Sequence, residues 1–366
     1  MAVGFLTVVT ERTGLGIIGT GRWADAHAEA AARSDVVRIV NCYSRSPEKR
    51  SAFASRHGLE RSSDSIEALL ADDQVGAVIV SSPNDSHAEH VIQVVTAGKP
   101  ALVDKPLAVS VTEGLELARA ASGQAPVGVA HNARRLAGHR AARDWIASGR
   151  AGVVRVAHAD FSNARGGELP EDAWYRTARG SEAGVLIQVG IHPIETLLYL
   201  LGPAISVNAR FAFEALGPTM PDAAIALVTH RSGAMSTLST SWTTPSHYVL
   251  DLQATSGNLE YRLDHSKWKR GDVDDFGTLT LDAPDQPRRK VDVARGDPLR
   301  EQLKELAGSA RHGTPMEVGI TEGLRAVAVV EASVLSAAQG GAPIEVEHLL
   351  SRAGATDGEI GSLLGV

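Results

Sequence analysis

A glycine-rich stretch near the start of the chain has the residue types and spacing of a phosphate-binding loop. The sequence "GIIGTGRWA" (16–24) follows the pattern G-x-G-x-x-A. The first glycine allows a tight turn, the second lets the backbone approach a pyrophosphate, and the small last residue lets the next helix pack closely. The N-terminus of that helix then faces the phosphates. Because the loop follows an apolar strand and opens a helix, it predicts a dinucleotide site. The residues assigned to the cofactor here are Gly19, Thr20, Gly21, Arg22 and Trp23.

The residues after the second predicted strand favour NADP over NAD. An NAD site places Asp or Glu on the ribose about 20 residues beyond the glycines. In "NCYSRSPEK" no carboxylate comes before Glu48, and Ser44 and Arg45 stand there instead. A hydroxyl and a guanidinium suit a 2′-phosphate, and an arginine can also stack on adenine. The alternative is that Arg45 is a solvated loop cation.

Two further strand ends carry polar residues. The stretch "SSPNDSHAEH" (81–90) follows one strand, and loops at the carboxyl ends of parallel strands line the ligand crevice. We therefore assign Ser82, Pro83, Asn84 and His87 to the cofactor side. His87 and His90 are three residues apart, but without a third ligand they do not make a metal site, so none is predicted.

The stretch "LVDKPLA" (102–108) ends an apolar run on a lysine. Lysine is rarely buried, so Lys105 at the end of a core strand needs a reason. Pro106 restricts the backbone of Lys105 to extended conformations, which fixes where its side chain starts. The pattern predicts that Lys105 points into the ligand crevice.

The order of the predicted elements indicates two architectures. Strand-like runs at 15–19, 36–44, 77–83, 101–106 and 125–132 alternate with helical stretches, which is typical of a parallel sheet covered on both faces. Beyond about residue 150 the strands 153–162, 205–213, 223–230, 234–242 and 248–255 include pairs joined by short turns, which predicts an antiparallel sheet. Segment 184–202 is long, apolar and helical in its second half.

These elements predict an α/β fold with four segments. Residues 1–13 are a leader or an added edge strand, 14–135 a dinucleotide-binding domain with a doubly wound sheet, and 136–350 a second domain that contains the antiparallel sheet. Residues 351–366 are expected to be a frayed tail.

Composition narrows the function classes. The chain has 366 residues and a formal net charge of −7, which argues against a nucleic-acid partner. One cysteine, Cys42, can form neither an internal disulfide nor a thiolate zinc site, and it fits a reducing cytoplasm. We find no apolar run near the ~20 residues that span a membrane.

Four stretches in this order resemble the Gfo/Idh/MocA family of glucose–fructose oxidoreductase, inositol dehydrogenase and their relatives. They are "GIIGTGRWA", "SSPNDSHAEHVIQVVTAGKPALVDKPLA", "GVLIQVGIHPIETLLYLLG" and "ITEGLRAVAVVEASVLSAAQGGAPIEV". The resemblance implies a Rossmann domain followed by an α/β domain with a large, mostly antiparallel open sheet. It also implies that residues 136–350 form a substrate-binding and oligomerisation domain, which builds a homodimer or homotetramer through that sheet.

The resemblance implies roles for single residues. The family's E-K-P motif corresponds to Asp104-Lys105-Pro106, with the lysine near nicotinamide and substrate, the preceding residue on the cofactor side and the Lys–Pro peptide often cis. The second motif, Asp-x-x-x-His, reads Gln188 to His192 here, and Glu195 falls where the family often has Asp. Lys105, His192 and Gln188 are thus the candidate catalytic residues.

The implied reaction is hydride transfer between a nicotinamide cofactor and a secondary alcohol or ketone of a sugar, sugar derivative or cyclitol. His192 would be the acid/base, since its unperturbed pKa suits neutral pH. Lys105 would polarise the same oxygen.

Two departures from the family pattern bear on that chemistry. Asp104 is one methylene shorter than glutamate, so its hydrogen bonds must be re-aimed. Gln188 cannot ionise and cannot carry protons as an aspartate could. If that aspartate is needed, a relay must come from elsewhere, and Asp160, Glu182 and Tyr175 are the substitutes that the sequence offers.

Four more residues are assigned to the substrate, together with Lys105, Gln188 and His192. Asn132 and Arg134 follow the fifth strand in "HNARR", and Trp174 and Tyr175 lie in "DAWYR", just before the second motif. A packed loop is the equal alternative for both stretches.

Two other functions stay open. A non-catalytic dinucleotide sensor of the same fold is favoured by the changes at Asp104 and Gln188, whereas the retention of Lys105 and His192 favours an enzyme. An NAD-dependent glycoside hydrolase-like relative is the other alternative.

Overall fold

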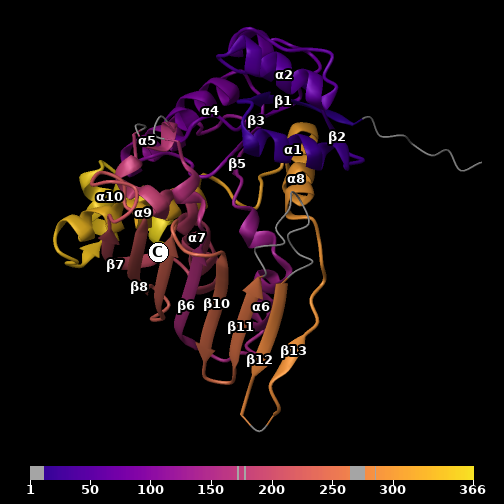
Figure 1. Ribbon diagram of the computed structural model, residues 1–366. Coiled ribbons are helices and arrows are strands. Elements are labelled where there is room, and N and C mark those ends of the chain that lie inside the picture. The colour runs from indigo at the N-terminus through magenta and orange to yellow at the C-terminus, as the bar shows by residue number, and fades with distance from the viewer. Residues whose placement is uncertain (1–11, 171–172, 177–178, 264–276, 285) are drawn as a thin grey trace, which may run out of the picture.

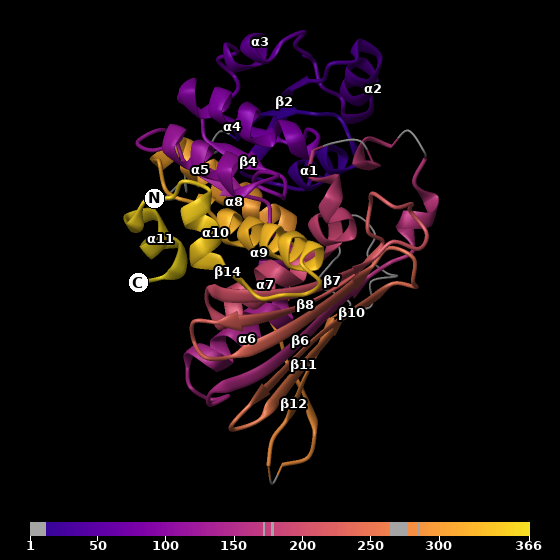
Figure 2. The same cartoon turned by 90° about the vertical axis from the view of Figure 1, so that its left-hand side faces the viewer.

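Two sheets, one parallel and one mostly antiparallel, organise the chain (Figure 1). The computed structural model describes residues 12–170, 173–176, 179–263, 277–284 and 286–366. Figure 2 shows the parallel layer at the top, the broad sheet at the bottom, and the helices α7 (Ile191–Leu201) and α9 (Ile320–Ala338) between them. The predicted α/β fold class is confirmed.

The parallel sheet has five strands in the order β2-β1-β3-β4-β5. The strands are β1 (Thr13–Ile18), β2 (Val37–Tyr43), β3 (Ala77–Val80), β4 (Ala101–Val103) and β5 (Val127–Val129). The helices that connect them are α1 (Arg22–Ala32), α2 (Pro47–His57), α3 (Ile66–Leu70), α4 (His87–Thr96) and α5 (Val111–Ala120). Strand β3 is buried along its whole length, as a strand covered on both faces must be. The strand order reverses between β1 and β3, and ligands bind at such a switch point.

The second sheet has nine strands in the order β13-β12-β11-β10-β6-β9-β8-β7-β14. The strands are β6 (Val154–Ser162), β7 (Ala204–Ala212), β8 (Ala223–His230), β9 (Met235–Ser241), β10 (His247–Ala254), β11 (Asn258–Leu263), β12 (Gly277–Asp282), β13 (Arg289–Val291) and β14 (Ile344–Glu345). The predicted antiparallel pairing is confirmed, except that β6 and β9 run parallel.

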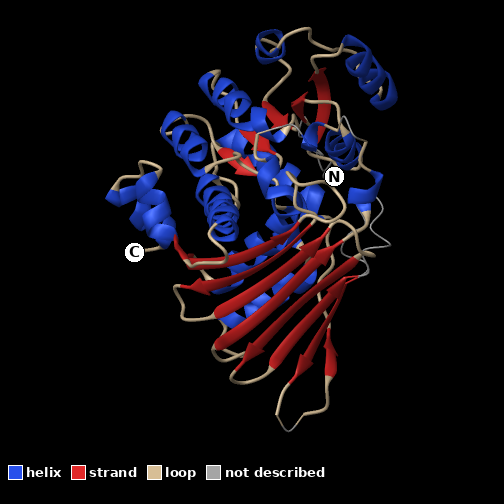
Figure 3. Cartoon of the chain, turned by 60° about the vertical axis from the view of Figure 1, so that its left-hand side comes forward, coloured by secondary structure: helices blue, strands red, loops and turns tan. Residues whose placement is uncertain are grey.

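Helices cover one face of this sheet. In Figure 3 the helices gather behind the broad sheet, and α6 (Ala137–Ala147), α7 and α9 belong to this layer. Burial alternates along β8, so successive side chains point to the covered face and to the open face of the sheet. Ala224 and Ala226 are buried, whereas Ile225 and Leu227 are 61% and 40% exposed. The open face thus presents apolar side chains.

Helix α8 (Pro298–His312) returns from the second sheet to the first. Its residues Leu299, Leu303 and Leu306 share a core with Leu15 and Ile17 of β1. Figure 1 shows α8 beside α1. Residues after 136 therefore do not all pack with the second sheet, and α8 adds a wall to the first.

The last residues are ordered, so the expectation of a frayed tail is wrong. Helix α10 (Val346–Arg352) is followed by α11 (Asp357–Leu364), which buries Ile360, Leu363 and Leu364. Thr356 and Glu359 form a capping box at the start of α11. At the other end, β1 begins at Thr13, and the leader or edge strand predicted before it lies almost wholly outside the described residues.

Several connections in the described part of the chain are short helical turns. A π-helical turn spans Leu186–Gly190 directly before α7, and 3-10 turns lie at Asn84–Ser86, Asn132–Arg135, Arg165–Glu168, Trp174–Arg176 and Ser181–Ala183. Within the described ranges, no helix is long and apolar enough to cross a membrane.

Candidate active site

A cleft of about 590 Å³ lies at the carboxyl ends of β1, β3 and β4. All thirteen residues assigned to the cofactor from the sequence line it: Gly19, Thr20, Gly21, Arg22, Trp23, Ser44, Arg45, Ser82, Pro83, Asn84, His87, Asp104 and Lys105. The structure therefore brings these residues together from four separate stretches of the chain. Their contact with a cofactor stays a prediction.

The glycine loop has the shape of a phosphate cradle. Gly19 has a φ of +100°, and a Cβ there would lie 2.3 Å from the carbonyl oxygen of Ser81, so no other residue fits without strain. At Gly21 a Cβ would meet nothing within 4 Å. Gly21 is also the N-cap of α1 and offers no side-chain cap, and the N-terminus of a helix favours an anion. The loop fits a dinucleotide pyrophosphate.

The far end of the cleft is cationic. Ser44, Arg45, Ser46 and Lys49 line it. Ser46 caps α2 through the N–H of Lys49 and donates to Glu48 over 2.7 Å, which turns the nearest carboxylate to the helix start. Arg45 is exposed and forms no ion pair within the described residues. This end of the cleft therefore presents two cations and two hydroxyl groups.

Asp104 is held as a buried anion. Nε2 of His27 lies 2.8 Å from its Oδ1, and Ser81 donates to its Oδ2. Burial by itself would raise the pKa of Asp104, but the His27 contact and these hydrogen bonds bring it below its usual value. The shorter side chain is thus re-aimed at His27 on α1, a residue that the sequence analysis did not single out.

His87 connects the cofactor loop to the lysine motif. Its ring nitrogens lie 2.7 Å from the carbonyl oxygen of Pro106 and 2.8 Å from that of Ser82. Burial lowers the pKa of His87, and a neutral imidazole donates to one of the two carbonyls. His87 therefore positions the two loops that form the floor of the cleft.

Lys105 reaches from the loop after β4 to the π-helical turn before α7. The Lys105–Pro106 peptide is cis, and Nζ donates to the backbone oxygen of Gln188 over 2.6 Å. Burial lowers the pKa of Lys105 to about 8. The negative charge of Asp104 raises this pKa, and the positive charge of Arg165 lowers it further. At neutral pH the ammonium form still predominates.

The second motif lies across the cleft from Lys105. The π-helical turn supplies the Gln188 carbonyl, and the Gln188 side chain lines the cleft. His192, on the first turn of α7, is buried, with its ring centroid 5.7 Å from that of Phe161. Lys105 thus contacts the backbone of Gln188 and not its side chain.

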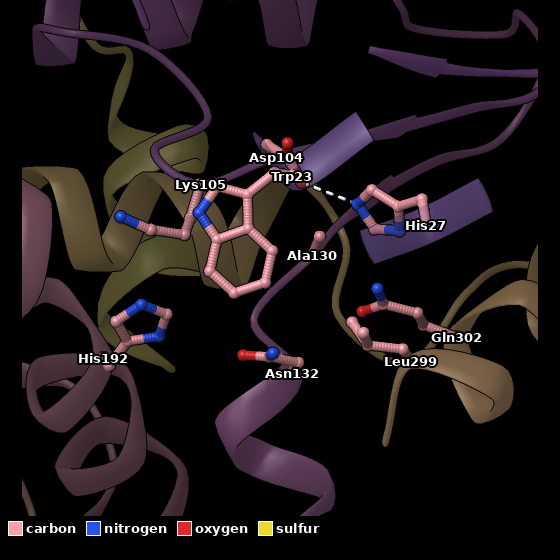
Figure 4. A pocket seen from close by; sticks show the side chains of 9 residues that line it. All are labelled: Trp23, His27, Asp104, Lys105, Ala130, Asn132, His192, Leu299 and Gln302. Atoms are coloured by element: carbon pink, nitrogen blue, oxygen red, sulfur yellow. Dashed lines mark hydrogen bonds and ion pairs between the residues drawn. The ribbon is translucent and has the colours of Figure 1, made fainter. Parts of the chain in front are cut away.

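A smaller inner chamber adjoins the cleft and contains both Lys105 and His192 (Figure 4). Its wall is formed by Trp23, His27, Asp104, Lys105, Ala130, Asn132, His192, Leu299 and Gln302. The sequence analysis missed His27 and Gln302. A signal for Gln302 exists, since it is a polar residue among Leu299, Leu303 and Leu306 on the apolar face of one helix.

The structure divides the remaining substrate candidates. Trp174 and Tyr175 line the cleft with their rings stacked at a centroid distance of 4.0 Å. Arg134 lines neither cavity, because its Nε donates to the buried Glu195 over 2.7 Å and its guanidinium lies 4.5 Å over the Tyr199 ring. Burial raises the pKa of Glu195, and the Arg134 charge opposes that rise.

The substitutes considered for an aspartate relay are likewise separated. Asp160 accepts hydrogen bonds from Ser162 and Ser239 on the second sheet. Neither Asp160 nor Glu182 lines the cleft or the chamber, whereas Tyr175 lines the cleft. Within the described ranges, no three His, Cys, Asp or Glu side chains group to hold a metal ion.

Comparisons with known proteins agree with this arrangement. The model of the oxidoreductase family with an NAD-binding Rossmann fold (GFO_IDH_MocA) matches residues 13–131, and that of the GFO/IDH/MocA C-terminal domain matches residues 139–264. The 1,5-anhydro-D-fructose reductase of Ensifer adhaerens is 30% identical over 67% of this chain and 74% of its own. The scyllo-inositol 2-dehydrogenase (NADP(+)) of Bacillus subtilis is 32% identical over 30% of this chain and 34% of its own.

A solved structure extends the likeness to nearly the whole chain. It comes from Desulfitobacterium hafniense DCB-2 and is provisionally named an NADPH-dependent oxidoreductase. It superposes with a TM-score of 0.88 at 32% identity and covers 93% of this chain and 99% of that one.

The environment of Lys105 predicts a lysine that titrates well below the usual lysine value. After reductive methylation with ¹³C-formaldehyde, one dimethyl-lysine NMR signal should titrate near pH 8, and it should be missing in Lys105→Arg. In Asp104→Asn this signal should titrate at lower pH, because the carboxylate that favours the ammonium is gone. A Lys105 signal that titrates near 10.5 would contradict the described burial.

Proposed function

The chain belongs to the Gfo/Idh/MocA family of NAD(P)-dependent oxidoreductases, and from that premise we propose its reaction. It transfers a hydride between NADP and a secondary alcohol or ketone of a sugar, sugar derivative or cyclitol. The observation that carries the proposal is that Lys105 and His192 meet in a chamber that opens beside the dinucleotide cleft.

The chain's own residues handle the proton and the substrate oxygen. In alcohol oxidation His192 takes the hydroxyl proton, and Lys105 donates a hydrogen bond to the same oxygen as it gains negative charge. The nicotinamide, when bound, supplies the hydride chemistry. With a pKa of about 8, Lys105 is mostly an ammonium at neutral pH and is the stronger donor for this purpose.

The substrate class is argued from the relatives and the cleft wall. The named activities of the Ensifer and Bacillus relatives concern an anhydro sugar and an inositol. Trp174 and Tyr175 give the cleft a stacked aromatic wall, and Gln188 adds a donor and an acceptor. A sugar or cyclitol has an apolar ring face that can stack on the aromatic rings, and its hydroxyl groups can bond to Gln188.

The preference for NADP rests on the cationic end of the cleft. Arg45 and Lys49 stand where a 2′-phosphate would lie, and Glu48 is engaged by Ser46. The names of the Bacillus relative and the Desulfitobacterium structure also specify NADP(H). NADP is therefore proposed as the cofactor, within the NAD(P) dependence of the family.

The direct test is turnover against a panel of polyols and keto sugars, including scyllo-inositol and 1,5-anhydro-D-fructose, with both dinucleotides. At least one pair with NADP(H) should show steady reduction or oxidation at 340 nm. If dinucleotide binds and nothing turns over, the chain is the sensor of the alternative hypothesis. In a second panel of aryl glycosides, release of the aglycone without net redox change would instead identify a glycoside hydrolase-like enzyme.

The same cleft predicts how one arginine sets the cofactor preference. Arg45→Ala should raise the Kd of NADP about tenfold or more and leave that of NAD within about twofold, because a charge-assisted contact to phosphate is lost. Isothermal titration calorimetry measures both constants. Arg61→Ala, an exposed arginine outside the cleft, is the control. Equal Kd values for NADP in the Arg45 variant and the wild type would remove the preference.

We also propose a homodimer or homotetramer that buries the open face of the nine-stranded sheet. Ile225, Leu227 and Met235 are 61%, 40% and 48% exposed there, and contiguous apolar surface of this kind marks interaction sites. A cytoplasmic location and the lack of a nucleic-acid or membrane partner stay predictions of the sequence.

Charges placed on that face should separate the subunits. The double variant Ile225→Lys, Leu227→Lys is expected to elute as a 38.5 kDa monomer in size-exclusion chromatography with light scattering, whereas the wild type elutes as an oligomer. Val366→Lys, an exposed apolar residue at the chain end, is the control. An unchanged mass in the double variant places the interface elsewhere.

A further inference from the structure

We propose that the inner chamber is an amide-binding subsite that receives the carboxamide of the nicotinamide through Gln302 and Asn132. The proposal rests on the proposed use of NADP and deepens it, because it assigns the end of the cleft that the phosphate loop does not reach. It also moves Asn132 from the substrate side, where the sequence placed it, to the cofactor side.

The first observation is a buried amide that has no partner. Gln302 is 1% exposed, and within the described residues neither its Nε2 nor its Oε1 forms a hydrogen bond. Asn132 is 3% exposed, and its Oδ1 is likewise unpaired there. A buried polar group without a partner destabilises a fold, so two of them facing one chamber indicate a ligand that completes them.

The donors and acceptors of the chamber match a neutral primary amide. Gln302 offers two N–H donors and one acceptor, and Asn132 offers a further acceptor. A carboxamide presents a carbonyl oxygen to the Gln302 N–H and its own N–H groups to the oxygens of Gln302 and Asn132. A carboxylate would face the same two oxygens with acceptors only.

The charged groups of the chamber are already engaged. Asp104 accepts from His27 and Ser81, and Lys105 donates to the Gln188 carbonyl. Besides the two histidine rings, the two amides are the polar groups of the chamber that carry no charge and pair with no other side chain, and they select for hydrogen bonding rather than for charge.

The chamber lies where the nicotinamide end of the dinucleotide must go. Trp23, Asp104 and Lys105 line both the chamber and the cleft, so the two cavities share a wall. Trp23 follows the phosphate cradle by two residues, which ties the chamber to the pyrophosphate site. In Figure 4 the indole of Trp23 stands between Lys105 and Ala130, above Asn132.

Entry of the ring requires Trp23 to shift. The chamber and its opening enclose about 250 Å³, but only about 10 Å³ of this takes the centre of a water molecule while the indole stands there. That space suits one water, which is the occupant expected before the cofactor binds. The carboxamide then displaces this water, and its anchoring sets the ring beside Lys105 and His192.

The test uses Gln302→Met, which keeps the length of the side chain and removes its hydrogen bonds. The Kd of NADP should rise about tenfold, as expected for one or two lost hydrogen bonds to a buried group. The Kd of adenosine 2′,5′-bisphosphate, which has no nicotinamide, should stay within about twofold. Gln339→Leu, at the exposed end of α9, is the matched control and should change neither constant.

A cofactor analogue makes the test specific for the amide. The 3-acetylpyridine analogue of NADP keeps the carbonyl and lacks the N–H donors. It should bind the wild type more weakly than NADP does, and Gln302→Met should lose most of that discrimination. The melting temperature of the free variant should be equal to or above that of the wild type, because a buried unpaired amide has been removed.

Three results with the variant would overturn the inference. They are an unchanged Kd for NADP in Gln302→Met, equal losses for NADP and the bisphosphate, and undiminished discrimination against the analogue. A wild type that binds the bisphosphate and NADP equally also contradicts it, because the nicotinamide then adds nothing. A wild type that binds no dinucleotide at all would instead refute the proposed function, and a crystal structure with NADP would show which group occupies the chamber.

Discussion

One hydrogen bond, from Nζ of Lys105 to the backbone oxygen of Gln188, joins the end of the parallel sheet to the turn before α7 at the point where chemistry is proposed. The lysine comes from the end of β4 and the carbonyl from the π-helical turn before α7. π-Turns expose backbone groups that a regular helix would pair, and they recur at functional sites. The contact holds the ammonium at the wall of the chamber that His192 also lines, where both groups must act.

The buried ammonium in turn requires the groups around it. Burial favours its neutral form, and the adjacent Asp104 carboxylate counters this and keeps the pKa of Lys105 at about 8. Asp104 stays ionised because His27 and Ser81 hold both of its oxygens. The two departures from the family pattern are thus accommodated differently. The shorter carboxylate gains a histidine partner from α1, and the amide at 188 serves through its backbone.

The sequence predicts features that a few neighbouring residues define, and it does not predict features that depend on contacts between distant segments. The phosphate loop and the strand ends at Ser44, Ser82 and Lys105 were predicted because a glycine pattern and apolar runs within a few residues define them. Gln302 and His27 were missed because their role depends on α8 and α1 meeting beside the chamber, which no local pattern shows. Arg134 was expected in the cleft, but the 3-10 turn at 132–135 directs it to Glu195 instead. The ordered α11 could have been predicted, since Thr356 and Glu359 have capping-box spacing before Ile360 and Leu363.

The central claim is that Lys105 acts on the reacting oxygen and does not merely hold the cofactor. The most direct measurement compares Lys105→Met with the wild type, with the Kd of NADP from calorimetry and the hydride-transfer rate from single-turnover absorbance at 340 nm. The account predicts a Kd within about threefold of the wild type and a rate that falls about 100-fold or more, as for the loss of a donor to a developing oxyanion. Hydride transfer at the wild-type rate in this variant would contradict it.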